Sequence, residues 1–167
     1  MKNRDTILFL HGLESVPGGA KADFLKECGY RVLNPALSKH SFKKAVATAQ
    51  SIIDKEKPSV IVGSSRGGAI AMSVNAPEAT LVLVAPAWKR YRQREGAPAA
   101  GIPSNTIIIH SKNDKVIPFA DSEALALASG AKLIATGSSH RMADPRALMA
   151  IAAAVATGTK ESDNEDR

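Results

Sequence analysis

A serine framed by glycines is the residue best suited to chemistry in this sequence. The pentapeptide Gly63-Ser64-Ser65-Arg66-Gly67 has the pattern G-x-S-x-G, with Ser65 at its centre. It follows the apolar run 59–62 and precedes a helical segment, the context in which this pattern forms a tight strand-to-helix turn. In such a turn glycines avoid side-chain collisions, and the N–H after the serine faces a developing oxyanion. The pattern therefore predicts Ser65 as a nucleophile.

A phosphate-binding turn is the alternative interpretation of the same glycines. A glycine-rich strand-to-helix turn can bind a phosphate through its backbone amides. The sequence lacks the lysine of a P-loop and the G-x-G-x-x-G spacing of a dinucleotide site. The nucleophile interpretation is therefore favoured, with Ser64 in the variable position of the pattern.

A serine hydroxyl needs a base, and the base needs a carboxylate to orient it. His140 lies in a loop after the predicted strand 132–135, and Asp114 directly follows the predicted strand 106–109. Parallel strands end at one edge of a sheet, so both side chains are expected on the same rim as Ser65. An exposed loop histidine and a turn aspartate are the structural alternatives.

Two other aspartates compete with Asp114 for the role of the acid. Asp121 lies past Pro118 in a predicted helix, and Asp144 has the position of a helix N-cap. Both fit structural roles better. The loop His11-Gly12-Leu13 after the first predicted strand could supply a second oxyanion donor, the N–H of Leu13, beside that of Arg66; a simple turn is the alternative.

Alternating strand and helix patterns must position these residues. Short apolar runs predict strands at 6–10, 30–33, 59–62, 80–84, 106–109 and 132–135. Helical spacing predicts helices at 20–28, 41–57, 69–74, 120–128 and 144–156, the last ended by Gly158, with an irregular segment at 86–103. Because the strands are continuously apolar, we expect an α/β fold: a three-layer sandwich with a mostly parallel sheet of about six strands.

Composition limits the other possibilities. The 167 residues suit one domain, predicted at 1–158, followed by a disordered acidic tail at 159–167. The net charge is +6, yet no RNA- or DNA-binding signature accompanies it, so no nucleic-acid partner is expected. No run is long enough for a membrane span and no signal peptide is visible, which predicts a cytoplasmic protein. Cys28 is the only cysteine, so no internal disulfide can form.

Taken together, these residues resemble the α/β-hydrolase superfamily. Four signatures occur in the order found there: Phe9-Leu10-His11-Gly12, Gly63-Ser64-Ser65-Arg66-Gly67-Gly68, Asp114-Lys115-Val116-Ile117-Pro118 and Ser139-His140. The stretch from His11 to Lys21 is similar to that of small, cap-less bacterial esterase-like hydrolases.

The resemblance implies a minimal α/β-hydrolase fold that cleaves an ester or thioester of a small substrate through an acyl-enzyme, without metal or cofactor. It implies that Ser65 attacks, His140 moves the proton and Asp114 orients His140, while the amides of Leu13 and Arg66 hold the oxyanion. A non-catalytic binding protein and a hydrolase of amide or carbon–carbon bonds remain alternatives.

The segment 86–103 stands where other members of the superfamily carry a helical cap. Trp88 and Tyr91 lie there among basic residues, and we expect them, with His11, to contact substrate. The basic residues and the side chain of Arg66 indicate an anionic substrate. A solvated basic loop is the alternative. The oligomeric state cannot be read from the sequence.

Overall fold

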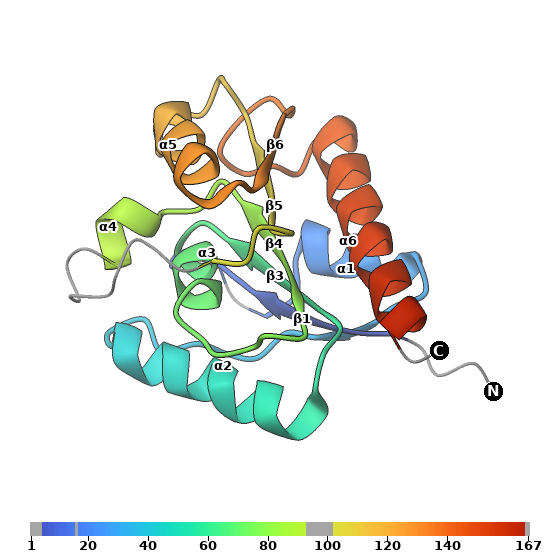
Figure 1. The fold of residues 1–167 in the computed structure, drawn as a ribbon. Coiled ribbons are helices and arrows are strands. Elements are labelled where there is room, and N and C mark those ends of the chain that lie inside the picture. The colour runs from blue at the N-terminus through green and yellow to red at the C-terminus, as the bar shows by residue number, and fades with distance from the viewer. Residues whose placement is uncertain (1–4, 16, 93–101, 166–167) are drawn as a thin grey trace.

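The structure, a computed structural model, describes residues 5–15, 17–92 and 102–165. Its centre is a six-stranded sheet in the order β2-β1-β3-β4-β5-β6, and all five strand pairings are parallel. The strands are β1 (Thr6–Leu10), β2 (Arg31–Leu33), β3 (Val60–Ser64), β4 (Thr80–Val84), β5 (Ile107–His110) and β6 (Lys132–Ala135). The helices are α1 (Ala20–Glu27), α2 (Phe42–Glu56), α3 (Arg66–Ala71), α4 (Trp88–Arg92), α5 (Phe119–Ser129) and α6 (Pro145–Glu165). The predicted three-layer α/β sandwich is confirmed (Figure 1).

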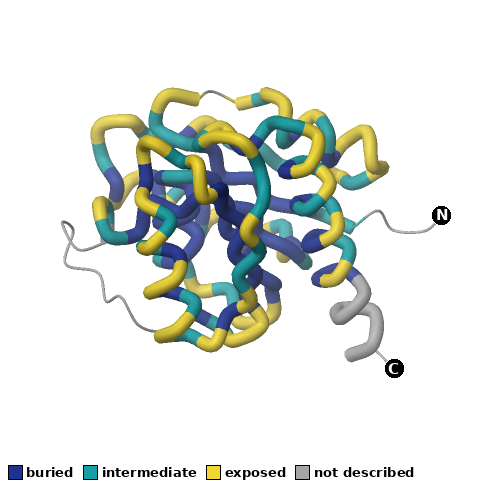
Figure 2. The backbone as a smooth tube through the Cα atoms, turned by 90° about the horizontal axis from the view of Figure 1, so that it is seen from above, coloured by how far each residue is buried: buried dark blue, intermediate teal, exposed yellow. Residues whose placement is uncertain are grey.

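Alternate residues of the central strands face opposite layers, which explains why these strands are largely apolar. Ile7 and Phe9 belong to a core shared with α1 and α6, whereas Leu8 and Leu10 belong to a core shared with α2, α3 and α5. The helices therefore cover both faces of the sheet, and Figure 2 shows the buried positions concentrated between the outer, exposed ones. Among the described residues, no helix combines the length and apolar character needed to cross a membrane.

Two local predictions differ from the structure around the serine and in the segment 86–103. The helix after the serine begins at Arg66 rather than at residue 69, because the turn at Ser65 leads directly into it. Within the segment predicted as irregular, Trp88–Arg92 forms the helix α4; residues 93–101 of that segment lie outside the described residues.

The last helix also differs from its prediction. It does not end at Gly158 but continues to Glu165, so the backbone is helical where a disordered tail from 159 was predicted. Residues 166–167 lie outside the described part of the chain. Gly158 instead allows close packing, because a Cβ there would lie 2.8 Å from side-chain atoms of both Thr80 and Val60.

Candidate active site

Ser65 occupies a strained turn between β3 and α3. Its backbone has φ 55° and ψ −116°, a conformation that a residue with a side chain rarely adopts. Hydrogen bonds hold it there: the Ser65 N–H donates to the Val84 carbonyl at 2.9 Å, and the Ser65 carbonyl accepts from Ala87 N–H at 3.0 Å. The turn therefore presents the Ser65 hydroxyl at the carboxyl edge of the sheet.

The glycines of the pattern are required by close backbone contacts around this turn. A Cβ on Gly63 would lie 2.5 Å from the Gly67 carbonyl oxygen, and one on Gly68 would lie 2.8 Å from Cβ of Pro86. A Cβ on Gly67 would collide with the carbonyl group of Leu10 in β1. The steric reason predicted from the sequence is therefore present at Gly63 and Gly67, and a similar close contact is found at Gly68.

Replacing Gly67 with Ala is expected to lower the free energy of unfolding by about 3 kcal/mol, because the methyl group meets backbone that cannot move aside. Urea denaturation would measure the loss. Gly29→Ala is the matched control, since its φ of 99° strains any side chain but nothing lies within 4 Å; a loss of about 1 kcal/mol is expected there. Equal losses in the two variants would contradict the steric explanation.

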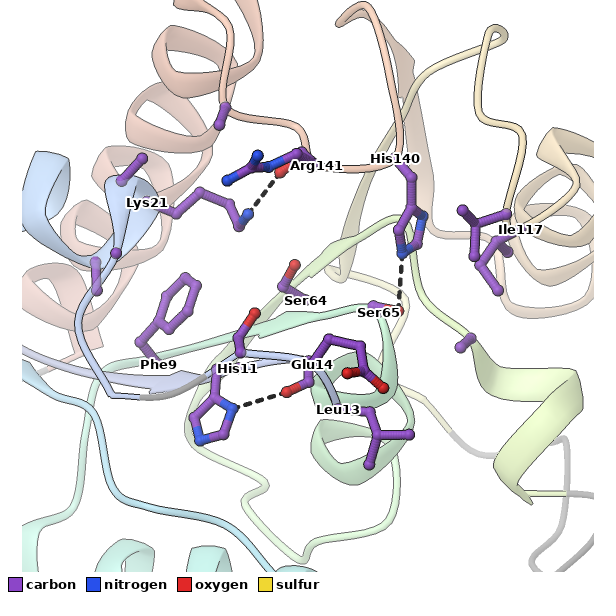
Figure 3. Close-up of a pocket in the computed structure, with 18 of the residues that line it drawn as sticks. Phe9, His11, Leu13, Glu14, Lys21, Ser64, Ser65, Ile117, His140 and Arg141 are labelled. Carbon is purple, nitrogen blue, oxygen red and sulfur yellow. Dashed lines mark hydrogen bonds between the residues drawn. The ribbon is translucent and has the colours of Figure 1, made fainter. Parts of the chain in front are cut away.

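Three side chains from distant segments form one chain of hydrogen bonds. His140 Nε2 lies 3.1 Å from Ser65 Oγ, and His140 Nδ1 lies 2.6 Å from Asp114 Oδ2. Figure 3 shows the His140 ring above Ser65. An ionised Asp114 can only accept, so the Nδ1–H of His140 donates to it and Nε2 is left to accept the proton of Ser65. The structure thus brings together the three residues that the sequence singled out.

The carboxylate of Asp114 is held by four donors. Its Oδ1 accepts from the N–H groups of Val116 at 2.7 Å and Ile117 at 2.8 Å, while Oδ2 accepts from two imidazoles. Burial by itself would raise the pKa of the Asp114 carboxyl, but these hydrogen bonds outweigh it and hold the pKa below its ordinary value. Asp114 is therefore ionised at neutral pH.

His110 is the second imidazole on Asp114. It is fully buried at the end of β5, with Nε2 2.9 Å from Asp114 Oδ2 and Nδ1 2.7 Å from the Ser122 hydroxyl. Since Asp114 accepts, His110 carries its proton on Nε2, and Ser122 donates to Nδ1. His110 directly follows the predicted strand 106–109, and nothing in the sequence indicated this contact.

The competing aspartates lie elsewhere. Asp121 forms an ion pair with Lys89 at 2.9 Å. Asp144 accepts hydrogen bonds from the Ser138 N–H at 3.0 Å and the Ala147 N–H at 3.3 Å, which makes it the N-cap of α6. Among the described residues, no hydrogen bond or ion pair joins either aspartate to His140.

The loop after β1 lies beside Ser65. A Cβ on Gly12 would lie 3.5 Å from Cβ of Ser65, and Leu13 lines the same cleft. Arg66 is the first residue of α3, so its N–H points out of the helix N-terminus, where negative charge is favoured. The loop after β1 and the first turn of α3, which carry the two predicted oxyanion donors, therefore both lie next to Ser65.

A cleft of about 560 Å³ opens at Ser65 and His140. It is lined by residues of β1, β3, α1 and α4 and of the loops that follow the strands (Figure 3). The lining includes Phe9, His11, Leu13, Glu14, Lys21, Ser65, Arg90, Tyr91, Ile117, His140 and Arg141. His11 is almost buried, with Nδ1 2.8 Å from the Gly12 carbonyl oxygen. In the described part of the chain, no group of three His, Cys, Asp or Glu side chains is arranged to hold a metal ion.

Two side chains expected near the substrate lie elsewhere. Trp88 is 6% exposed, belongs to the core and donates its Nε1–H to the Asp121 carbonyl at 2.9 Å, so its predicted contact with substrate is wrong. The Arg66 guanidinium donates to the Ser38 carbonyl at 2.7 Å and lies 5.7 Å from the Phe42 ring and 5.6 Å from the Tyr91 ring. It anchors α4 to α2 and is not a cation of the cleft, because it is turned into the protein.

Residues 6–97, more than half of the chain, match the model of an uncharacterised protein family, UPF0227. The chain belongs to this family. No curated protein sequence matches this UPF0227 protein significantly.

Solved structures similar to this UPF0227 protein share its α/β-hydrolase fold. Est1E from Butyrivibrio proteoclasticus, solved with ferulic acid bound, is 18% identical, with a TM-score of 0.72 over 96% of this chain and 90% of that one. Alpha/beta hydrolase domain-containing protein 10 from mouse is 16% identical, with a TM-score of 0.74 over 93% and 90%. MGS-MChE2, an α/β-hydrolase enzyme from the metagenome of lagoon sediments at Mar Chica, Morocco, is 21% identical, with a TM-score of 0.70 over 96% and 93%. The resemblance to the α/β-hydrolases is thus confirmed for the fold.

Proposed function

We propose that this protein is a serine hydrolase that cleaves a carboxylic ester or thioester of a small substrate through an acyl-enzyme at Ser65. The observation that carries the proposal is the chain of hydrogen bonds from Ser65 through His140 to Asp114, at the mouth of a cleft. Ferulic acid, bound to a protein of the same fold, supports a small-molecule substrate.

The geometry supports a two-step reaction. Ser65 Oγ attacks the substrate carbonyl as its proton passes to His140 Nε2, and the N–H groups of Leu13 and Arg66 hold the oxyanion. Asp114 stabilises the imidazolium of His140 across the 2.6 Å hydrogen bond. Collapse of the intermediate expels the alcohol or thiol with that proton, and water then releases the acid in the same way. No step calls for a metal or a cofactor.

A binding protein without activity is the alternative from another class. The strained backbone of Ser65 argues against a binding protein. Such a conformation costs about 1–3 kcal/mol of stability, and binding a partner does not require it. Cleavage of an amide or carbon–carbon bond would use the same three residues. These reactions differ in the substrate rather than in the site, so substrate assays distinguish them.

A fluorophosphonate probe tests the nucleophile directly. The wild-type protein is expected to gain one probe molecule on Ser65, found by intact-mass and peptide mass spectrometry, and to hydrolyse p-nitrophenyl acetate. Ser65→Ala is expected to lose both properties. Ser64→Ala, which removes the neighbouring serine, is the matched control and is expected to keep the label. Undiminished labelling or turnover in Ser65→Ala would overturn the proposed function.

A further inference from the structure

One wall of the cleft carries two cations from distant parts of the chain. Lys21 belongs to the first turn of α1, and Arg141 follows His140 in the loop after β6. The ammonium of Lys21 donates to the backbone carbonyl of Arg141 at 2.6 Å, so the two residues are side by side (Figure 3). The hydrogen bond therefore ties Lys21 to the loop that carries His140.

These cations have no acidic partner among the residues that the structure describes. No ion pair joins Lys21 or Arg141 to a carboxylate, although Glu14 lines the same cleft. Burial lowers the pKa of the Lys21 ammonium, and the charge of Arg141 lowers it further. Two like charges thus share a partly desolvated wall, an arrangement that a bound anion would relieve.

This wall keeps unused hydrogen-bonding capacity beside a ligand-sized space. Lys21 uses one ammonium hydrogen for the Arg141 carbonyl, which leaves two, and no hydrogen bond of the Arg141 guanidinium is found with the described residues. Phe9 and Ile117 supply apolar surface in the same cleft of about 560 Å³. Apolar walls with a few convergent polar groups are typical of small-molecule sites.

We propose that Lys21 and Arg141 form a subsite for a carboxylate group carried by the ester that reacts at Ser65, an inference that rests on the proposed function. The planar guanidinium matches the geometry of a carboxylate, and charge-assisted hydrogen bonds are the stronger ones. The subsite selects anionic esters over neutral esters of the same shape.

A purely structural role for Lys21 is the competing explanation. Its hydrogen bond to Arg141 holds the loop of His140, and losing that bond would slow every ester alike. The subsite, in contrast, acts only on charged substrates. The ratio of kcat/KM for an anionic ester to that for a neutral match therefore separates the two roles.

Two matched pairs of esters supply this ratio. In 4-acetoxybenzoate and 4-acetoxybenzamide the charge differs in the leaving group, whereas in mono-4-nitrophenyl adipate and its terminal amide the charge differs in the acyl group. The wild-type protein is expected to prefer the anionic member of at least one pair by about tenfold, the value of one charge-assisted hydrogen bond. The pair that shows the preference tells which side of the ester lies on the subsite.

Variants then assign the preference to residues. Lys21→Met and Arg141→Gln are each expected to reduce the anionic-to-neutral ratio several-fold, and the double variant to abolish the preference. Lys26→Met and Arg146→Gln remove equal charge outside the cleft and are the matched controls. No preference in either pair, or a preference that persists in the double variant, would overturn the subsite.

Binding measurements keep this test separate from that of the hydrolase. Calorimetry measures the affinity of the Ser65→Ala variant for two stable acids, 4-acetamidobenzoate and adipic acid monoanilide. These affinities are compared with those of the corresponding uncharged carboxamides. Tighter binding of an acid that Lys21→Met removes supports the subsite, even if no ester is turned over. Equal affinity of acids and carboxamides overturns it, even if Ser65-dependent hydrolysis is found.

Discussion

Replacing His140 with Ala is expected to lower kcat for ester hydrolysis by about 10⁴-fold or more, with a much smaller change in KM. The imidazole is the only base within 3.1 Å of Ser65 Oγ among the described side chains, so its loss leaves the hydroxyl protonated and weakly nucleophilic. The side chain of His140 is 22% exposed, and its removal is expected to leave the fold intact. Steady-state kinetics with p-nitrophenyl esters and a thermal melt would measure both effects.

A double variant that combines His140→Ala with Ser65→Ala gives a stricter test of the role of His140. Because the two residues act as a unit, the double variant is expected to be no slower than either single one. His40→Ala is the matched control, since His40 is exposed and lies outside the cleft. If His140→Ala retained more than a tenth of the activity while Ser65→Ala lost it, the base would have to be another group, and His11 lines the same cleft.

The sheet and the nucleophile were predictable because local signals determine them. The bounds of β1, β4 and β6 agree with the predicted runs. The central strands β1 and β4 are largely buried and therefore apolar, whereas the edge strand β6 begins with the exposed Lys132. The turn at Ser65 was predictable because glycine is needed on both sides of it. Once the strand order along the chain was known, the carboxyl edge also followed for Asp114 and His140, since every strand is parallel.

Other parts of the site depend on contacts between distant residues. No helical pattern marks α4 in the sequence. Trp88 is positioned by its hydrogen bond to the Asp121 carbonyl, and Tyr91 by its contacts with the Phe42 and Arg66 side chains. Gly158 looked like a helix end, but the nearness of β3 and β4 explains it. Arg66 and Lys21 show the same limit of prediction from the sequence. Arg66 is next to the nucleophile in sequence, but its side chain is turned into the protein. Lys21 lies 44 positions before Ser65 and yet lines the cleft. Side-chain direction follows from tertiary packing, which spacing in the sequence does not contain.

Replacing Asp114 with Asn is expected to lower kcat by about 10⁴-fold, although Asn has nearly the same shape. The N–H groups of Val116 and Ile117 donate to Oδ1, so the amide oxygen must take that position. The amide NH₂ then faces His140 Nδ1, which has to accept instead of donate. The proton of His140 consequently moves to Nε2, where it blocks acceptance of the Ser65 proton.

The same geometry makes His110 part of this expectation. With NH₂ in place of Oδ2, the Nε2–H of His110 meets a donor as well, so His110 must shift its proton to Nδ1 toward the Ser122 hydroxyl. Nitrogen-15 spectra of the two imidazoles would show both tautomers changing together. Asp121→Asn is the matched control, because its carboxylate forms an ion pair with Lys89 away from the His140 ring. This variant is expected to keep both tautomers and most of the activity. If Asp114→Asn kept the Nδ1–H tautomer of His140 and still lost activity, the orienting role of the carboxylate would be wrong, and the negative charge itself would be what His140 requires.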